Sequence, residues 1–552
     1  MRVLDSLTSG TIPNNEGDPD SPLPGIQQTN LLPGLILCGA FLARFYEAWA
    51  YFFNPDEALH YLLASQSSLD LAYRAALTNA HPPLLILLLY YWRALGHSEL
   101  MLRLPSVVAG TACCWISYLW LKLVADRSTA LLGLLLFGFA PALIGLSAEV
   151  RQYALLLFFM SGCLYLSERA IRGNSILAMI LFSLSLYGAL LTHYSSFIFA
   201  FTLGVYMLVR LYPYAGRSRL VAVWSLGQIG GTALAGYYLL THVARLRESG
   251  MPRGIAETWL RKSIFHAGEN HVAVFIAAQT LRVFTYLLSH GIGGTLTLLA
   301  FLVGIASLLR RKNGPRGTRP RPRELALLLV LPFVVNCGAA LAGIYPYGAT
   351  RHNAFLALFG LSGASFGLGV WKPRRTWVAP LVLAACLAAC NFFPAPPPLI
   401  RASNHHRISM TEAVGSLRKS VAPGSILFAD YESGLLLGYY VCGHGVVQVF
   451  PPYESFVRSD CGAYTAITAR PEEWKFYSTD FSEQLTSFAQ VYKPTPGTKV
   501  WLFDAGWIVD SVPALRDQLR RRGCAAPKSF GENILLCQFE VGSGADLGPS
   551  NR

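Results

Sequence analysis

The chain has 552 residues, of which 53% are hydrophobic and only 14% are charged, with a formal net charge of +14. Soluble domains usually carry about 25% charged residues, so this composition, with a mean hydropathy of +0.40, excludes an ordinary soluble enzyme and indicates a polytopic membrane protein. The positive charges lie in short connections between apolar runs, which argues against a nucleic-acid partner.

The first 30 residues are polar and lack the apolar core of a cleavable signal peptide, and we expect 1–30 to be a disordered cytoplasmic tail. Apolar runs of roughly 18 residues or more then predict spanning helices. Eleven are expected, at 31–52, 103–124, 129–147, 152–169, 175–192, 195–211, 220–243, 291–309, 325–344, 351–371 and 376–393.

Arginine and lysine cluster in alternate connections, most densely in 310–323, which holds seven positive charges. Basic connections lie on the cytoplasmic side of a membrane, so these connections are predicted to be cytoplasmic and the ones between them external. By this parity 53–102 is a first external loop, in which the short apolar segment 81–96 is expected to lie in the interface. The segment 244–290 becomes a long external loop, with 272–288 lying on or dipping into the bilayer.

After the rigid PAPPP linker at 394–398 the composition becomes that of a soluble protein. Alternating helix and strand patterns predict a small external α/β domain over 394–541, followed by a disordered tail at 542–552. Four of the eleven cysteines fall in this domain, and an even number in an oxidising compartment permits two disulfides. The pairs Cys442–Cys461 and Cys524–Cys537 are favoured, although spacing alone does not fix the pairing.

The stretch NPDEALH at 54–60 places two adjacent acids just beyond the first apolar run. Asn54 as N-cap, Pro55 at the first helical position and Glu57 as the partner of a capping box account for it as a helix start. A capped helix start is also a rigid mount for a general base, which must lie in a partly dry site close to its substrate. Asp56, Glu57 and His60 also have a spacing that could hold a cation, but we expect no metal because nearby arginines and histidines can supply positive charge.

Further polar residues fall at the same predicted external face. They come from several separate connections: His81, Arg103, Glu149 with Arg151 and Tyr153, His193, and Tyr345 with Arg351 and His352. Each alone has a structural explanation, such as an arginine that reaches a lipid headgroup. Together, acids for proton transfer and arginines for phosphate indicate transfer of a group from a lipid phosphate, as in moving a sugar from polyprenyl phosphate.

The motifs DEALHYLLA, HPPLLILLL, SELMLRLPSVVAG, EVRQYALLLF and THYSS, in this order over roughly 30–370, resemble the GT-C glycosyltransferases of the protein-mannosyltransferase superfamily. The branch is similar to bacterial members grouped with protein O-mannosyltransferases and the lipid A aminoarabinose transferase. The resemblance implies a GT-C fold and an inverting transfer from a polyprenyl-phosphate sugar to a lipid, glycan or protein acceptor at the periplasmic face of the inner membrane.

The resemblance also assigns roles to single residues. It maps the catalytic acid of the Asp-Glu pair to Asp56, the acid of the second external turn to Glu149 and the HPP histidine to His81, and it maps the family's arginines to Arg103 and to Arg351, the latter expected to meet phosphate. Our hypothesis from the sequence is that Glu57 and Glu149 orient or tune Asp56, that Arg103, Arg151 and Arg351 bind phosphate, and that His81 contacts donor phosphate or acceptor. The chain departs from the family pattern at Gln152, where proline is usual, and at His352, where tyrosine is usual.

Two other functions remain open at this point. A transporter or flippase of lipid-linked sugars would need polar residues through the depth of the bilayer, and Arg44 and Glu47 in the first span are the main ones present. A sensor whose external domain binds a ligand would leave the acids at the membrane edge unexplained.

Overall fold

The structure is a computed structural model of the whole chain. It describes residues 31–248 (except 215 and 217), 256–312 (except 258), 318–370, 382–387, 406–443, 456–469, 488–505 (except 490, 491 and 496) and 524–541 (except 525, 526, 532 and 533). The expected tails at 1–30 and 542–552 and the PAPPP linker lie outside these residues.

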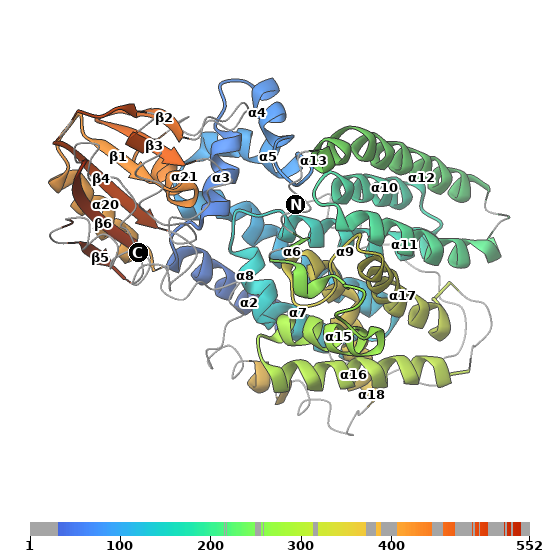
Figure 1. Cartoon of the computed structure of the whole chain (residues 1–552). Helices are drawn as coiled ribbons and strands as arrows, with labels where there is room; N and C mark the ends of the chain where they lie inside the picture. The colour runs from blue at the N-terminus through green and yellow to red at the C-terminus, as the bar shows by residue number, and fades with distance from the viewer. Residues whose placement is uncertain are drawn as a thin grey trace.

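A bundle of long helices forms most of the molecule (Figure 1). Its helices are α2 (Leu31–Ala50), α6 (Glu99–Val124), α7 (Arg127–Phe139), α8 (Pro141–Ser147), α9 (Tyr153–Gly173), α10 (Ile176–Leu190), α11 (Ser195–Leu211), α12 (Ser218–Tyr238), α15 (Val272–Leu288), α16 (Gly291–Arg310), α17 (Pro322–Leu341) and α18 (Ala357–Val370), the last preceded by the 3₁₀ turn η5 (Arg351–Leu356). Ten of the eleven predicted spans coincide with these helices; of the eleventh only 382–387 is described.

Six of the described helices are long and apolar enough to cross a membrane, or seven if α7 and α8 form one bent span. The chain is therefore a multi-pass membrane protein, while the figure of eleven crossings stays a prediction.

The span expected at 129–147 is not one straight helix. It breaks after α7 and continues as α8 at an angle of 58°, because Pro141 has no N–H to extend the ladder. The buried Arg44 donates to the carbonyls of Phe137 at 3.0 Å and Gly138 at 2.7 Å, which the break leaves free. Arg44, which the sequence showed only as a polar residue inside the first span, thus stabilises a helix break inside the bundle.

The first external loop contains three short helices, α3 (Pro55–Ala64), α4 (Leu69–Ala76) and α5 (Leu84–Trp92), and a 3₁₀ turn, η1 (Arg93–Leu95). The helix expected over 81–96 begins only after the Pro82–Pro83 pair, and Leu84 N–H donates to the Leu191 carbonyl at 3.0 Å. The long loop after α12 contains a π-helical turn, η3 (Leu239–Val243), α13 (Ala244–Glu248) and a second 3₁₀ turn, η4 (Arg261–Ser263), before α15.

The C-terminal region is a mixed α/β unit. It contains α20 (Arg407–Ser420), β1 (Ile426–Ala429), α21 (Tyr431–Tyr440), β2 (Phe456–Cys461), β3 (Tyr464–Ala469), β4 (Thr498–Ala505), β5 (Lys528–Phe530) and β6 (Ile534–Val541). The strand order is β2-β3-β1-β4-β6-β5, with β1 parallel to β3 and β4. Both favoured disulfides, Cys442–Cys461 and Cys524–Cys537, are present.

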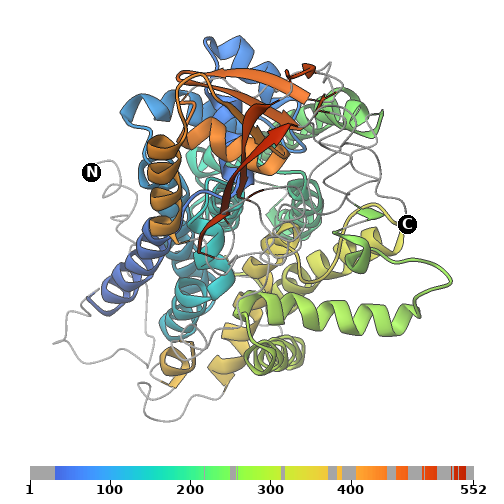
Figure 2. The same ribbon diagram turned by 60° about the vertical axis from the view of Figure 1, so that its left-hand side comes forward.

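The α/β region packs directly on the first external loop. Figure 1 shows the sheet beside the bundle with α3 and α21 between them, and Figure 2 shows α20 close to the end of α2. There Tyr51 and His406 form an isolated β-bridge. One hydrophobic core includes residues from α3, α5, α6, α20, α21 and the sheet, so the α/β region and the loop share a buried interior.

Candidate active site

The start of α3 forms the capped helix that its sequence predicts. Asn54 Oδ1 accepts from the Glu57 N–H at 3.0 Å, and Glu57 Oε2 accepts from the Asn54 N–H at 3.1 Å, which completes a capping box. Pro55 occupies the first helical position, where a missing N–H costs nothing. The backbone around Asp56 is therefore fixed by local bonds.

Glu57 forms a buried, bidentate ion pair with Arg103 of α6. The guanidinium Nε lies 2.7 Å from Glu57 Oε1 and one terminal nitrogen lies 2.6 Å from Oε2, and the two side chains are only 1% and 2% exposed. Glu57 Oε1 also accepts from the Val150 N–H at 2.8 Å. This pair ties α3 to α6 and to the turn before α9.

Arg103 also donates to three backbone carbonyls, those of Ala48, Tyr51 and Phe52. A guanidinium has five N–H donors, and all of them are used here. The expectation that Arg103 binds the donor phosphate therefore does not fit the structure, because this residue has no donor left for an anion. Its position makes it a structural clamp for the first external loop.

Asp56 points away from this clamp toward two other arginines. Asp56 Oδ2 lies 2.5 Å from Arg151, in the turn before α9, and 2.8 Å from Arg351 at the start of η5. Its side chain is 27% exposed, whereas Arg151 and Arg351 are 4% and 14% exposed. Burial alone raises the pKa of Asp56, but the attraction of the two guanidinium groups outweighs it and holds the pKa well below its usual range. Asp56 is thus an ionised carboxylate held between two guanidinium groups.

Three histidines and a tyrosine form a cluster of rings beside these charges. The ring centroids of His81 and His193 are 4.9 Å apart and stacked, and His352 lies 5.7 Å from His193 and 6.3 Å from His81. Tyr153 lies 5.3 Å from His193. Burial, followed by the nearby arginine charge, lowers the pKa of His193 to about 3, and burial with the neighbouring His193 lowers that of His81. Both rings are therefore neutral at pH 7 and act as hydrogen-bonding groups rather than as cations.

Several buried polar atoms around this cluster have no hydrogen-bond partner among the described residues. They are Glu149 Oε2, Arg151 Nε, the side-chain amide of Gln152, Tyr153 OH, His193 Nε2 and Thr350 Oγ1. A buried polar group without a partner costs roughly 1–3 kcal/mol, so such a concentration is typical of a site that a polar ligand completes. His193 Nδ1 accepts from the Ser195 N–H at 3.1 Å, which leaves Nε2 as the atom that carries the proton.

Glu149 differs from the other acids because its environment favours the protonated form. It is 8% exposed, and burial together with the charge of Glu57 raises its pKa to about 8. At pH 7 the carboxyl is mostly neutral and can donate a hydrogen bond. Asp56 and Glu149, two acids in one site, are thus held in opposite protonation states.

The segment after α17 closes one side of the site. Tyr345 OH donates to the His352 carbonyl at 3.2 Å, so it supports the ring cluster through the backbone. Tyr347 OH and Thr280 Oγ1 of α15 are 2.8 Å apart. The long loop before α16 therefore contacts the segment that carries Arg351.

The structure gathers nearly all residues proposed from the sequence in one region. Arg151 and Arg351 both pair with Asp56. His81, Tyr153, His193 and His352 pack together beside them. Sequence reasoning missed Gln152 and Thr350 as site residues; the departure from proline at position 152 was the available signal.

His60, considered from the sequence as a cation ligand, hydrogen-bonds to the Asn79 side chain through Nε2 and to the Asp56 carbonyl through Nδ1. Within the described residues no group of three or more His, Cys, Asp or Glu side chains has the geometry to hold a metal ion.

Comparisons with known proteins agree with this architecture. Residues 80–227, from the HPP motif into α12, match the family model described as dolichyl-phosphate-mannose-protein mannosyltransferase. ArnT from Cupriavidus metallidurans in the apo state is 14% identical with a TM-score of 0.55, over 94% of this chain and 99% of that chain. The same protein bound to undecaprenyl phosphate is 14% identical with a TM-score of 0.52 over the same shares. No curated protein sequence matches the chain.

These matches show the class of protein: the chain is a membrane protein with the GT-C fold. The resemblance to the protein-mannosyltransferase superfamily is confirmed over residues 80–227. The bacterial ArnT structures share the fold over almost the entire chain.

Proposed function

We propose that the protein is a glycosyltransferase that moves a sugar from a polyprenyl-phosphate donor to an acceptor hydroxyl, with inversion, and that Asp56 is the general base. The observation that carries this proposal is the single Asp56 carboxylate held between Arg151 and Arg351, beside buried polar groups that lack partners. The solved ArnT complex with undecaprenyl phosphate supports a lipid phosphate as the ligand of this fold.

The proposed reaction needs one proton acceptor and one site for a departing anion. The acceptor oxygen attacks the anomeric carbon of the sugar and its proton passes to Asp56. The bond between the anomeric carbon and the phosphate oxygen breaks, and the electron pair leaves with the lipid phosphate. Arg151 and Arg351 are permanently charged and can stabilise the negative charge that grows on the phosphate.

The same arginines explain how an acid with a lowered pKa can serve as a base. Without substrate, Asp56 is the anion that neutralises the two guanidinium groups. A lipid phosphate that binds these arginines takes over that role and brings negative charge close to Asp56. Both changes raise the pKa of Asp56, since a like charge and the loss of ion pairs favour the protonated carboxyl. Phosphate binding would thus turn an inert carboxylate into a better proton acceptor.

The neutral ring cluster suits the sugar rather than the phosphate. Stacked imidazoles and the Tyr153 phenol offer flat surfaces and single hydrogen bonds, and their free polar atoms can bond to sugar hydroxyls. The protonated Glu149 can donate to a hydroxyl or to a phosphate oxygen. We propose no divalent metal in the reaction, because the two arginines already supply positive charge where the phosphate would lie.

By parity of the basic loops, we place the site and the α/β region on the periplasmic side of the inner membrane of a bacterium. The acceptor, whether lipid, glycan or protein, would approach from that side. A flippase of lipid-linked sugars is the alternative, and it would move the donor between leaflets without breaking it.

The test uses the purified full-length chain in lipid nanodiscs with a lipid extract from membranes of the producing cells. Mass spectrometry follows consumption of glycosyl polyprenyl phosphate and release of free polyprenyl phosphate. We expect wild type to consume the donor and Asp56→Asn to leave it intact. Asp56→Asn that works at the wild-type rate would remove Asp56 from the mechanism, and movement of an uncleaved donor in proteoliposomes would favour the flippase.

A further inference from the structure

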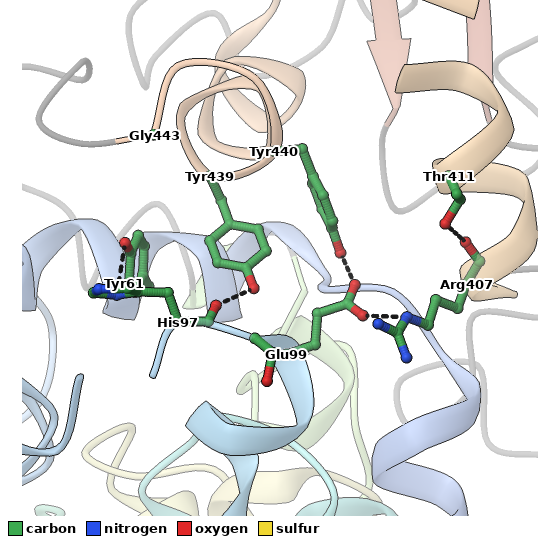
Figure 3. A pocket seen from close by; sticks show the side chains of 9 residues that line it. Tyr61, His97, Glu99, Arg407, Thr411, Tyr439, Tyr440 and Gly443 are labelled. Carbon is green, nitrogen blue, oxygen red and sulfur yellow. Dashed lines mark hydrogen bonds and ion pairs between the residues drawn. The ribbon is translucent and has the colours of Figure 1, made fainter. Parts of the chain in front are cut away.

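A second polar cluster lies where the α/β region meets the first external loop. A cavity of about 350 Å³ separates α3 and the start of α6 from α20 and the end of α21 (Figure 3). It is lined by Tyr61, His97, Ser98, Glu99, Arg407, Thr411, Tyr439, Tyr440 and Gly443. Nothing in the proposed reaction uses these residues.

The polar groups around the cavity bond mainly to one another across the junction. Tyr439 OH donates to the His97 carbonyl at 2.7 Å, and Arg407 Nε lies 3.0 Å from Glu99 Oε2 (Figure 3). Tyr440 OH donates to the other oxygen of Glu99. The cluster therefore joins the α/β region to the membrane bundle.

One of these bonds reaches the backbone next to the candidate base. Tyr440 OH accepts from the N–H of Phe53 at 2.8 Å. Phe53 is fully buried and directly precedes Asn54, the N-cap of the helix that carries Asp56. Burial and the adjacent Glu99 raise the pKa of the Tyr440 phenol, so it keeps the proton that it donates.

The Phe53 side chain is also fixed by contacts with its neighbours. Its ring stacks on Tyr439 with centroids 4.5 Å apart, and the Arg103 guanidinium lies 4.9 Å from its centroid. Arg103 is one helical turn after Glu99, so the partner of Tyr440 and the clamp of Glu57 lie on the same face of α6. A shift of Tyr440 would therefore move Phe53 and the residues that lead into α3.

We propose that Tyr440 is a positioning residue for Asp56: the C-terminal α/β region fixes the catalytic helix by bonding its phenol to the Phe53 N–H and to Glu99. This inference rests on the proposed role of Asp56. It gives the α/β region a function in the reaction, since a small misplacement of a reacting group lowers the rate steeply.

The test compares Tyr440→Phe with its neighbour Tyr439→Phe in the full-length protein. Both keep the ring and lose only a hydroxyl, but only Tyr440→Phe frees the Phe53 N–H. The assay is consumption of glycosyl polyprenyl phosphate from the membrane extract, with binding of undecaprenyl phosphate measured separately by native mass spectrometry. We expect Tyr440→Phe to lower kcat about tenfold with KM and undecaprenyl phosphate affinity within twofold, and Tyr439→Phe to stay within twofold in kcat.

A merely structural role would reduce the amount of folded protein without lowering kcat per folded molecule, so thermal unfolding and active-protein quantitation accompany the kinetics. Unchanged kcat in Tyr440→Phe, equal losses in both variants, or a raised KM with normal kcat would each overturn the proposal. A failure of the proposed function is separable, because it would show as no dependence of donor consumption on Asp56 in the wild-type background.

Discussion

Replacing Asp56 by asparagine should separate binding from chemistry. In the structure Asp56 pairs with Arg151 at 2.5 Å and Arg351 at 2.8 Å, the two arginines that we propose bind the lipid phosphate. Asparagine keeps the shape and an accepting oxygen but removes the charge. The variant should therefore lose transfer while it binds undecaprenyl phosphate more tightly than wild type does.

The magnitude follows from Coulomb's law. Two unit negative charges about 5 Å apart at an effective dielectric constant of ~20 repel each other by about 3 kcal/mol. Partial solvent exposure of Asp56 and relaxation of the arginines reduce this, so we expect a gain of about 1–2 kcal/mol. Since 1.4 kcal/mol is a factor of ten, the Kd should fall roughly 5- to 30-fold.

Native mass spectrometry or titration by intrinsic fluorescence would measure undecaprenyl phosphate binding to both proteins. A matched control is Asp70→Asn, which removes an exposed acid of α4 that pairs with Arg74 at 2.9 Å. This control should leave the Kd unchanged because an exposed pair contributes little. An Asp56→Asn protein that folds normally but binds with equal or weaker affinity would refute the competition between carboxylate and phosphate.

Two further outcomes follow from the charges of the site. Arg103→Met should lower the midpoint of thermal unfolding, because it leaves Glu57 a buried charge without its main partner, a loss of about 3–5 kcal/mol in stability. Arg103→Lys should rescue it poorly since an ammonium cannot reproduce the two-pronged contact, and an unchanged midpoint in Arg103→Met would disprove the clamp. Glu149→Gln should retain transfer at pH 7, where the carboxyl is mostly protonated, and should remove the decline in rate that we expect of wild type as pH rises through about 8. A rate–pH profile measures this, and a Glu149→Gln protein inactive at every pH would contradict the role of the neutral acid.

The sequence by itself determined the class of fold and where the chemistry would gather. Low charge and long apolar runs predicted the helical bundle. The alternation of basic connections predicted that the acids, arginines and histidines lie on one side of the membrane. The capping box at Asn54 and Glu57 was predictable because it depends on residues only three apart. The two disulfides favoured from the sequence, Cys442–Cys461 and Cys524–Cys537, are both present, although the sequence alone does not fix the pairing.

Only the tertiary structure decided which arginine meets which acid. Asp56 and Glu57 are neighbours, but successive residues of a helix point about 100° apart, so one faces Arg151 and Arg351 and the other faces Arg103. The sequence of charged residues alone cannot reveal this division. Because of it, Arg103, which was expected to bind phosphate, instead holds Glu57 and the first external loop. The bond from Phe53 to Tyr440 joins residues 387 positions apart, and no local pattern signals such a contact because it exists only when two regions distant in the sequence pack together.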